Sequence, residues 1–489
     1  MKKTILLSLL ACAGLTSCEI NDFFSSGRGN NNGRNSVELK DHSITPNFLD
    51  LKPGFKNLSV NVLLSSEDVL ENSPNFIYGS MADGAGLLKN NDGTFTLINN
   101  IEADYSVARI TLDKTFKPVA GEYILNATAT ANTAQCSGTL ITPEEHGFGP
   151  LWLSAGEWGG SRQGVYSVDP FKNTNDASSF EMLTALGQWA TENAVPLNKD
   201  AYPGKTVVII GEDASDDNTP KGQIAMYVGN RGDLYGGKLY GLKVTSPGIN
   251  YEVDMKEGQS YNVEFVEYSE RTLDELQLES EAKGIMGFSR VEDIDWRRGS
   301  AENNRELYVA VTGRKKAGLV GKGTTYGRIY QIKLDKNNPL KGKISCVLDG
   351  DILDGKAKAF HSPDNVLVTE NYVYIQEDPN GYPDTPEKAH YAYLYQYNIK
   401  SKNLKVVLEC DQNNAAALGY GTTSNSWELT GMIDVSETLD KDKTFLLITQ
   451  NHGWQPADGS AFTDPTANSN VLNSTKEGST LFVIKGLEK

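Results

Sequence analysis

A recurring set of short strand-like runs, separated by turns, constrains the fold of this sequence more than any other feature. From about residue 140 the runs come in groups, and three of them combine an aromatic residue with alternating apolar residues: GKLYGLKV (237–244), GRIYQIKL (327–334) and AYLYQYNI (392–399). Alternation with a period of two is typical of strands that bury one face. We therefore predict an all-β chain of blade-like units, a β-propeller, with a large β-sandwich as the alternative.

The composition agrees with many short strands. The chain has 489 residues, enough for one large or two ordinary domains, and its 47 glycines against 18 prolines suit numerous tight turns. Helices are expected only as short insertions. Two stretches have a helical spacing of apolar residues, Ser179–Thr191 and, more weakly, Glu270–Ser280.

The sequence leaves the domain assignment of residues 45–135 undecided. Residues 45–135 alternate strand-like runs such as LSVNVLL (58–64) and ARITL (108–112) with Asn/Gly turns. This pattern fits either the first blades of a propeller covering residues 45–489 or a separate small β subdomain. The sequence does not decide between them.

The N-terminus predicts export and lipid anchoring. In residues 1–18, two lysines precede an apolar run that is too short to cross a membrane, which is typical of a signal peptide. The end of the run, LTSC, resembles the bacterial lipobox, and the resemblance implies a lipid on Cys18. Residues 19–44 are rich in Gly, Asn and Ser at their centre and predict a flexible tether. We expect a protein anchored in the bacterial outer membrane, facing the periplasm or the cell surface.

The charge balance limits the partners. Acidic residues outnumber basic ones 63 to 46, a formal charge of −17, which argues against nucleic acid because phosphate binding needs a basic surface. An acidic surface is compatible with divalent cations. We expect a monomer.

The cysteines predict no zinc site. Beyond the signal peptide and Cys18 the chain has Cys136, Cys346 and Cys410, widely spaced and without a C-x₂-C pattern. At most one disulfide could form, and buried free thiols are expected.

Acidic residues recur at the ends of predicted strands in five places. One is HSPDNVLVTENYVYIQED (361–378), with two short strands at 366–368 and 372–375. The acids of the five places are Glu157; Glu212 and Asp213; Glu292 and Asp293; Asp364, Glu377 and Asp378; and Glu428. Each place alone is typical of a solvated turn. Their repetition at equivalent points of successive units suggests that loops far apart in sequence bring their acids to the central channel of a propeller.

Several carboxylates in one channel predict a metal centre. They would repel one another and raise their own pKa values unless cations neutralised them. Oxygen-rich groups suit Ca²⁺, and a centre with several metals can hold a phosphate and activate water. Arg290 lies beside one of the acidic places and could hold a phosphate by two hydrogen bonds.

An ordered set of motifs between about residues 145 and 455 carries a family resemblance. The segments are GQWATE (187–192), GEDAS (211–215), RVEDI (290–294), SPDNVLV with IQED (362–378), and WELTGMIDVS (427–436). In order and spacing they resemble the PhoX family of bacterial alkaline phosphatases and related PhoX-like lipoproteins. The resemblance implies a six-bladed propeller with iron and calcium in its channel that hydrolyses phosphate monoesters.

The resemblance also implies roles for particular residues. By motif position, Glu212, Glu292 and Glu428 would be metal ligands and, with Arg290, the catalytic set. Further ligands or outer partners of the metals would be Glu157, Asp213, Asp293, Asp364, Glu377 and Asp378.

The sequence departs from the family pattern at one triplet above all. Better-known members have Cys-Glu-Glu there, with an iron-binding cysteine, and Ala155-Gly156-Glu157 stands in its place. Loss of that thiolate favours Ca²⁺ over Fe³⁺ in what remains. Two hypotheses follow: a metal-dependent phosphatase acting on a small phosphorylated substrate, or a non-catalytic calcium-binding propeller that binds a ligand or a partner protein.

Overall fold

The predicted runs form short antiparallel strands. The computed structural model describes residues 36–214, 216–379, 383–469 and 476–489, and within these ranges the strands below make five hydrogen-bonded sheets. One sheet contains β3 (Ala82–Lys89), β4 (Phe95–Ile101), β5 (Ser106–Leu112) and β6 (Pro118–Leu125), and the next contains β7 (Thr133–Ile141), β8 (Leu151–Gly159) and β9 (Gly164–Val168). A nine-stranded sheet contains β10 (Thr191–Pro196), β11 (Lys205–Glu212), β12 (Ile224–Asn230), β13 (Lys238–Val244), β14 (Ser260–Glu267), β15 (Val291–Trp296), β16 (Glu306–Val311), β17 (Arg328–Leu334) and β18 (Lys341–Asp349). The last two sheets contain β1 (Leu49–Leu51) with β19 (Pro363–Val368), β20 (Tyr372–Glu377), β21 (Tyr393–Asn398) and β22 (Leu404–Cys410), and β2 (Ser59–Ser65) with β23 (Glu428–Asp434), β24 (Thr444–Asn451) and β25 (Gly478–Lys485).

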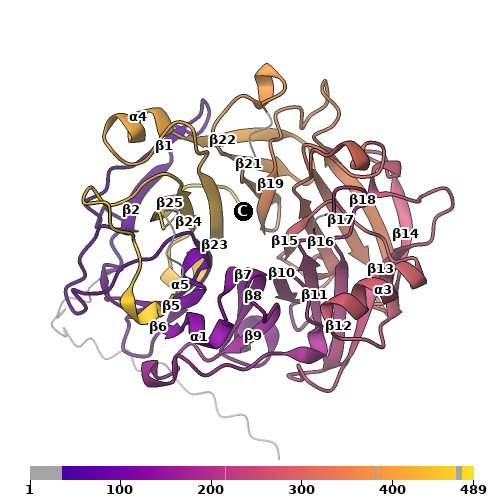
Figure 1. Cartoon of the computed structure of the whole chain (residues 1–489), viewed down its shortest axis with the longest axis horizontal. Coiled ribbons are helices and arrows are strands. Elements are labelled where there is room, and N and C mark those ends of the chain that lie inside the picture. Colours follow the sequence, from indigo (N-terminus) through magenta and orange to yellow (C-terminus); the bar gives the residue numbers. More distant parts are fainter. Residues whose placement is uncertain (1–35, 215, 380–382, 470–475) are drawn as a thin grey trace, which may run out of the picture. The chain divides into compact units, whose positions relative to one another are not determined.

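The sheets surround a central space (Figure 1). The strands nearest to it contact one another in a closed circuit, in the order β3, β7, β10, β15, β19, β23 and back to β3. This arrangement confirms the predicted all-β propeller. The nine-stranded sheet joins two antiparallel meanders through the pairing of β14 with β18, so the number of blades, predicted as six, stays a prediction.

The hydrophobic cores lie between neighbouring sheets, and strand alternation explains how one strand serves two of them. On β24, Leu446 and Ile448 pack in the core shared with β3–β6, whereas Phe445 and Leu447 pack in the core shared with β19–β22. Full burial of a side chain of this kind contributes about 1.5–3 kcal/mol.

The two ends of the described chain meet in the same sheets. β2 pairs with β25, with Val60 opposite Ile484, and β1 pairs with β22. Residues 37–489 form one compact unit. The strands of residues 45–135 lie within this unit, and the predicted domain bounds stay a prediction.

The last part of the predicted tether packs on the propeller. Val37 and Leu39 contact the core beside β3–β6, and the amides of Glu38 and His42 donate hydrogen bonds to the carbonyls of Thr115 and Val62. Alternating apolar residues at 37 and 39 explain the difference, because they give this segment a face to bury. The predicted signal peptide, Cys18 and most of the tether lie outside the described residues. Among the described residues, no helix has the length and apolar character needed to span a membrane.

Helices are short insertions, as predicted. The α-helices of the described residues are α1 (Ala127–Thr130), α2 (Pro143–His146), α3 (Leu273–Lys283), α4 (Gln412–Ala417) and α5 (Ser436–Leu439). The 3₁₀ turns are η1 (Glu102–Asp104), η2 (Thr174–Asp176), η3 (Thr184–Leu186), η4 (Glu252–Asp254), η5 (Asn303–Arg305), η6 (Ala317–Leu319), η7 (Pro386–Lys388) and η8 (Pro465–Ala467).

The two helix predictions had different outcomes. The one over Glu270–Ser280 is confirmed with a shift of a few residues, because α3 begins after Thr272 and ends at Gly284, which adopts the left-handed conformation. The prediction over Ser179–Thr191 is wrong. That stretch forms only η3, and it ends at Gly187, whose φ of 87° breaks the helical path before β10 begins.

Candidate metal centre

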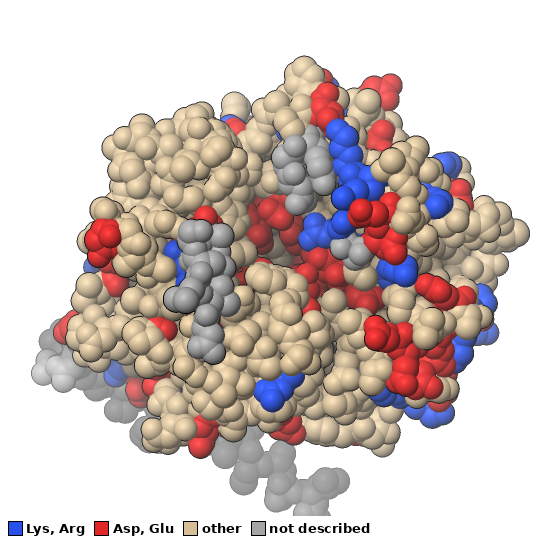
Figure 2. All heavy atoms as spheres, in the orientation of Figure 1, with Lys and Arg blue, Asp and Glu red and all other residues tan. Residues whose placement is uncertain are grey.

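Each strand of the inner circuit carries an acid or a thiol near its first residue. These residues are Asp83 on β3, Cys136 on β7, Glu192 on β10, Glu292 on β15, Asp364 on β19 and Glu428 on β23. All are buried, with at most 8% of any of them exposed. A space-filling view shows acidic residues gathered in a hollow at the middle of one face of the ring (Figure 2).

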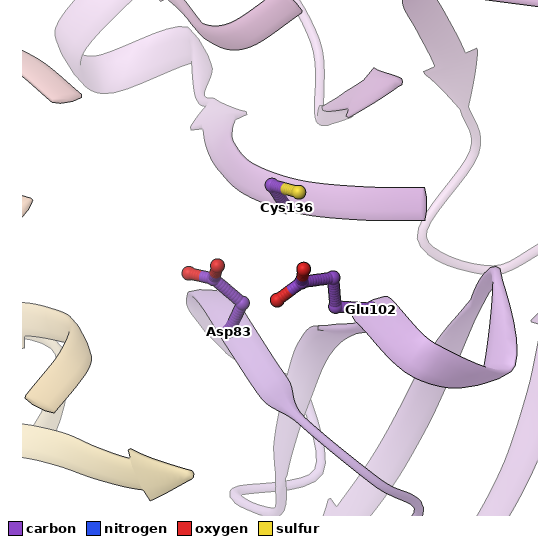
Figure 3. A group of neighbouring side chains, drawn as sticks. All are labelled: Asp83, Glu102 and Cys136. Carbon is purple, nitrogen blue, oxygen red and sulfur yellow. The ribbon is translucent and has the colours of Figure 1, made fainter. Parts of the chain in front are cut away.

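Three groups of these side chains and their neighbours bring their ligand atoms within 4.8 Å of one another. The groups are Asp83, Glu102 and Cys136; Cys136, Glu157 and Glu192; and Glu192, Glu292 and Asp364. Cys136 and Glu192 each belong to two groups, so the three groups form one continuous set of ligand atoms. In Figure 3 the carboxylates of Asp83 and Glu102 lie side by side and face the strand that carries Cys136.

A β-bulge places the thiol of Cys136. Gln135 pairs with Gly156 and Gly138 pairs with Ser154, so Cys136 and Ser137 on β7 oppose the single residue Ala155 on β8. Such a bulge redirects side chains of the bulged strand. The Sγ of Cys136 lies 2.8 Å from Oε2 of Glu157, to which the thiol donates. Burial, followed by the nearby carboxylates of Glu102 and Glu157, raises the pKa of the Cys136 thiol well above its usual value.

The carboxylates hold their protons tightly. Burial is the main cause that raises the pKa values of Glu157, Glu192 and Glu292 well above the usual range, and neighbouring carboxylates add to it. Burial and then the charge of Glu102 raise the pKa of Asp83 to about 7. Buried carboxylates at such separations are stable as anions only with cationic partners.

Asp378, which follows β20, joins the centre electrostatically. Its charge is the largest cause after burial of the raised pKa values of Asp364 and Glu428. Asp83 contributes to the same two shifts. Glu428 and Asp378 therefore face the same space as the three groups, although neither belongs to a group by distance.

Arg290 is the cation built into the centre. Its Nε and Nη2 donate to Asp213, at 2.9 Å for the shortest contacts, and Nη2 also lies 3.0 Å from Oε1 of Glu292. Burial alone would lower its pKa, but Asp213 and Glu292 outweigh burial and hold it well above the usual value. Its φ of 68° is uncommon outside glycine, and such strain persists where the surroundings fix a functional residue.

The geometry can be compared with known proteins. A profile of the family described as alkaline phosphatase PhoX matches residues 162–453. The chain belongs to the PhoX family. The PhoX match covers Glu192, Arg290, Glu292, Asp364 and Glu428 and begins after the other part of the centre, which consists of Asp83, Glu102, Cys136 and Glu157.

Solved structures agree with the fold. PhoX of Pseudomonas fluorescens, in complex with vanadate as a transition-state analogue, superposes with a TM-score of 0.60 at 14% identity, covering 91% of this chain and 98% of that one. A Fusarium graminearum GH93 α-L-arabinofuranosidase has a TM-score of 0.37 at 10% identity, covering 85% and 97% of the two chains. The Neurospora crassa Pan2 WD40 domain has a TM-score of 0.35 at 8% identity, covering 88% and 96%. The last two are too distant to carry an argument. No curated protein sequence matches this chain.

Two predicted ligands of this chain, Asp293 and Glu377, accept hydrogen bonds from other parts of the protein instead. Asp293 accepts hydrogen bonds from Asn193, from its neighbour's amide and from the amide of Val366, so it links three inner strands. Glu377 accepts from the amides of His361 and Tyr393 and from the hydroxyl of Tyr395. Their oxygens are occupied by protein donors, which leaves both residues outside the three groups.

Glu212 also lies outside the three groups. Burial, and then the charge of Asp213 beside it, raises its pKa to about 8. Its charge also contributes to the raised pKa of Tyr268, a residue of the core that Val208 and Ile210 of β11 share with Leu239 of β13. Asp213 accepts hydrogen bonds from Arg290, whereas Oε2 of Glu212 is buried and accepts none among the described residues.

Sequence reasoning missed Asp83, Glu102, Cys136 and Glu192 as ligands. Glu192 lay within a quoted motif and could have been included. Asp83 and Glu102 carry no motif, and Cys136 becomes visible only when the bulge opposite Ala155 is known. The candidate centre contains the thiol of Cys136, although Ala155 stands where the family has a cysteine; the preference for Ca²⁺ over Fe³⁺ stays a prediction.

Proposed function

We propose that this member of the PhoX family hydrolyses phosphate monoesters at a metal centre in the hollow of the ring. One observation carries the proposal: acids from separate strands converge with Cys136 into a single set of ligand atoms, and Arg290 contacts one of these acids, Glu292. A role in stability alone gives no reason to bury so many like charges together, because each costs free energy without a cation.

The residues fit metal ions by their chemistry. Oε1 of Glu292 accepts no well-directed hydrogen bond although it is buried, and the carbonyl oxygen of the Asn365 side chain accepts none among the described residues. The carboxylates of Glu192, Glu292 and Asp364 are the ligands that Ca²⁺ prefers. The group around Cys136 suits a metal that also accepts sulfur, which brings iron back as a candidate beside calcium.

Bound metals would supply charge neutralisation of the phosphate and an oxygen nucleophile formed from water. The chain itself supplies orientation. Asp213 and Glu292 hold the guanidinium of Arg290 in place, and its Nη1 makes no hydrogen bond within the described residues. That N–H group, on a side chain 22% exposed, is free to donate to a phosphate oxygen.

The test is turnover of p-nitrophenyl phosphate by protein stripped with a chelator and reloaded with Ca²⁺, with Fe³⁺ or with both. We expect activity only after reloading, and a large loss in Asp364→Asn. Glu264→Gln, an exposed acid on β14 far from the inner strands, is the matched control. Calcium bound by the wild type without turnover under any metal would overturn the proposal and support a non-catalytic calcium-binding propeller.

We also propose that the protein acts as a lipid-anchored monomer at the bacterial outer membrane, facing the periplasm or the cell surface. The lipobox-like end of residues 1–18 supports this proposal. The test is metabolic labelling with a fatty acid in the wild type and in Cys18→Ser. Labelling that does not depend on Cys18 would contradict it.

A further inference from the structure

Trp158 differs from every other tryptophan of the chain. The remaining five are at most 3% exposed, whereas Trp158 is 41% exposed. It belongs to none of the buried cores among the described residues. Other large apolar side chains of the described residues are exposed too, Phe171 and Tyr235 among them, so exposure alone gives Trp158 no role; its fixed position beside Glu102 does.

The ring is held in one orientation. Its Nε1–H donates to Oε1 of Glu102 at 2.7 Å. Tyr105 packs against it edge to face, with 5.9 Å between the ring centres and 79° between the planes. These two contacts fix the indole while leaving much of its surface open.

The same contacts place the ring beside the metal centre. Glu102 is a member of the group with Asp83 and Cys136, and the residue before Trp158, Glu157, is a member of the next group. A single carboxylate therefore separates the indole from the ligand atoms. The exposed part of the indole therefore belongs to a side chain that is hydrogen-bonded directly to a member of the groups.

We propose that Trp158 determines substrate preference by stacking on a planar ring in the leaving group, as in a 5′-nucleotide or an aryl phosphate. The inference rests on the proposed phosphatase function. Stacking between a base and an aromatic side chain is favourable for every base because each has a π-face. A ring already fixed by Glu102 and Tyr105 loses little conformational entropy when the ligand binds.

The experiment compares adenosine 5′-monophosphate with ribose 5-phosphate, which share the same leaving oxygen and differ in the base. We expect the wild type to prefer the nucleotide by about tenfold in kcat/KM, the size of one base–aromatic stack. Trp158→Ala should bring this ratio close to one. Trp158→Phe, which keeps a ring but loses the bond to Glu102, should retain most of the preference. Phe171→Ala, another exposed aromatic residue, is the control and should leave the ratio unchanged.

The outcomes separate this inference from the proposed function. Equal ratios in the wild type and Trp158→Ala, with good turnover of both substrates, would overturn the stacking role and leave the phosphatase intact. If neither substrate is turned over, the phosphatase proposal fails, and calorimetric dissociation constants of the same two ligands with calcium-loaded protein give the ratio instead. If the preference for the nucleotide falls as far in Trp158→Phe as in Trp158→Ala, the aromatic ring alone does not produce it. Trp158 would then act by holding Glu102 and not by stacking.

Discussion

The candidate metal centre is assembled from two regions of the chain with different chemistry. The C-terminal region, within the PhoX match, contributes Glu192, Glu292 and Asp364 and the cation Arg290. The N-terminal region, before the match, contributes Asp83, Glu102, Cys136 and Glu157. The first is rich in oxygen and contains a built-in positive charge. The second contains a thiol and lies beside an exposed tryptophan.

The difference teaches that strand pairing can supply a ligand that the motif lacks. Ala155 carries no thiol, but Cys136 lies opposite it at the bulge between β7 and β8. Sequence motifs identify the candidate ligands of the C-terminal region, whereas those of the N-terminal region are identified only from the pairing of strands. Four substitutions test whether the two regions act as one centre.

The largest effect is expected for Glu192→Gln, because Glu192 belongs to a group with Cys136 and to a group with Glu292. The amide keeps the shape but removes the charge that both groups share. Loss of an outer hydrogen-bond partner of a metal ligand costs about 10–100-fold, so loss of a shared ligand should lower kcat/KM by at least about 100-fold. Turnover of p-nitrophenyl phosphate and metal content by mass spectrometry measure it. An unchanged metal content would contradict the hypothesis that the two regions form one metal centre.

A smaller and more selective effect is expected for Cys136→Ser in the N-terminal region. The hydroxyl preserves the size of the side chain but binds soft metals poorly. Cobalt-loaded wild type should show a sulfur-to-metal charge-transfer absorption that the variant lacks, while calcium content stays the same. We expect activity to fall by about tenfold, the low end of the range for altered metal surroundings. Cys346→Ser is the control, because Cys346 is a buried free thiol on β18 that belongs to none of the three groups. Identical spectra in Cys136→Ser and the wild type would exclude the thiol as a ligand.

The fold was predictable from the sequence because its signal is local and repeated. Runs such as GRIYQIKL became β17, and the short strands predicted at 366–368 and 372–375 lie within β19 and β20. The alternation of apolar and polar residues within each run predicts which face of the strand is buried. The helix predicted at Ser179–Thr191 failed because its apolar spacing reflects irregular packing around Trp189, and Gly187 interrupts it.

The candidate site was predictable only where a strand end bears a recognisable motif. Glu292, Asp364 and Glu157 were found this way, and the ring brings them together. Asp293 and Glu377 share those motifs but accept hydrogen bonds from neighbouring strands, which the sequence does not display. Cys136 and Asp83 required knowledge of which strands become neighbours, and that is a property of the closed ring.

A change in substrate binding is expected for Arg290→Lys in the C-terminal region. Lysine keeps the charge but lacks the planar fork that contacts Asp213 and Glu292 together. Loss of one charge-assisted hydrogen bond to the phosphate should raise KM by about tenfold with a smaller change in kcat. Steady-state kinetics with p-nitrophenyl phosphate measure it. If kcat falls and KM stays constant, Arg290 acts on the transition state or on the metals rather than in substrate binding.

The smallest effect on activity is expected for Glu212→Gln, because Glu212 belongs to none of the three groups, and this variant decides whether the centre includes it. Burial, and then Asp213, raises the pKa of Glu212 to about 8, against 4.5 in the unfolded chain. The folded protein therefore binds this proton more tightly, and Glu212 makes stability fall as pH rises from about 4.5 to about 8. Glutamine removes that dependence. We expect the melting temperature at pH 9 to rise by about 2 °C, the shift that about 1 kcal/mol produces in a large domain, with little change at pH 5 and kcat within a factor of about two of the wild type, as for a substitution away from the reacting groups. If Glu212→Gln instead removes metal and activity as Glu192→Gln does, Glu212 is a ligand as its motif predicts, and the centre extends to the end of β11.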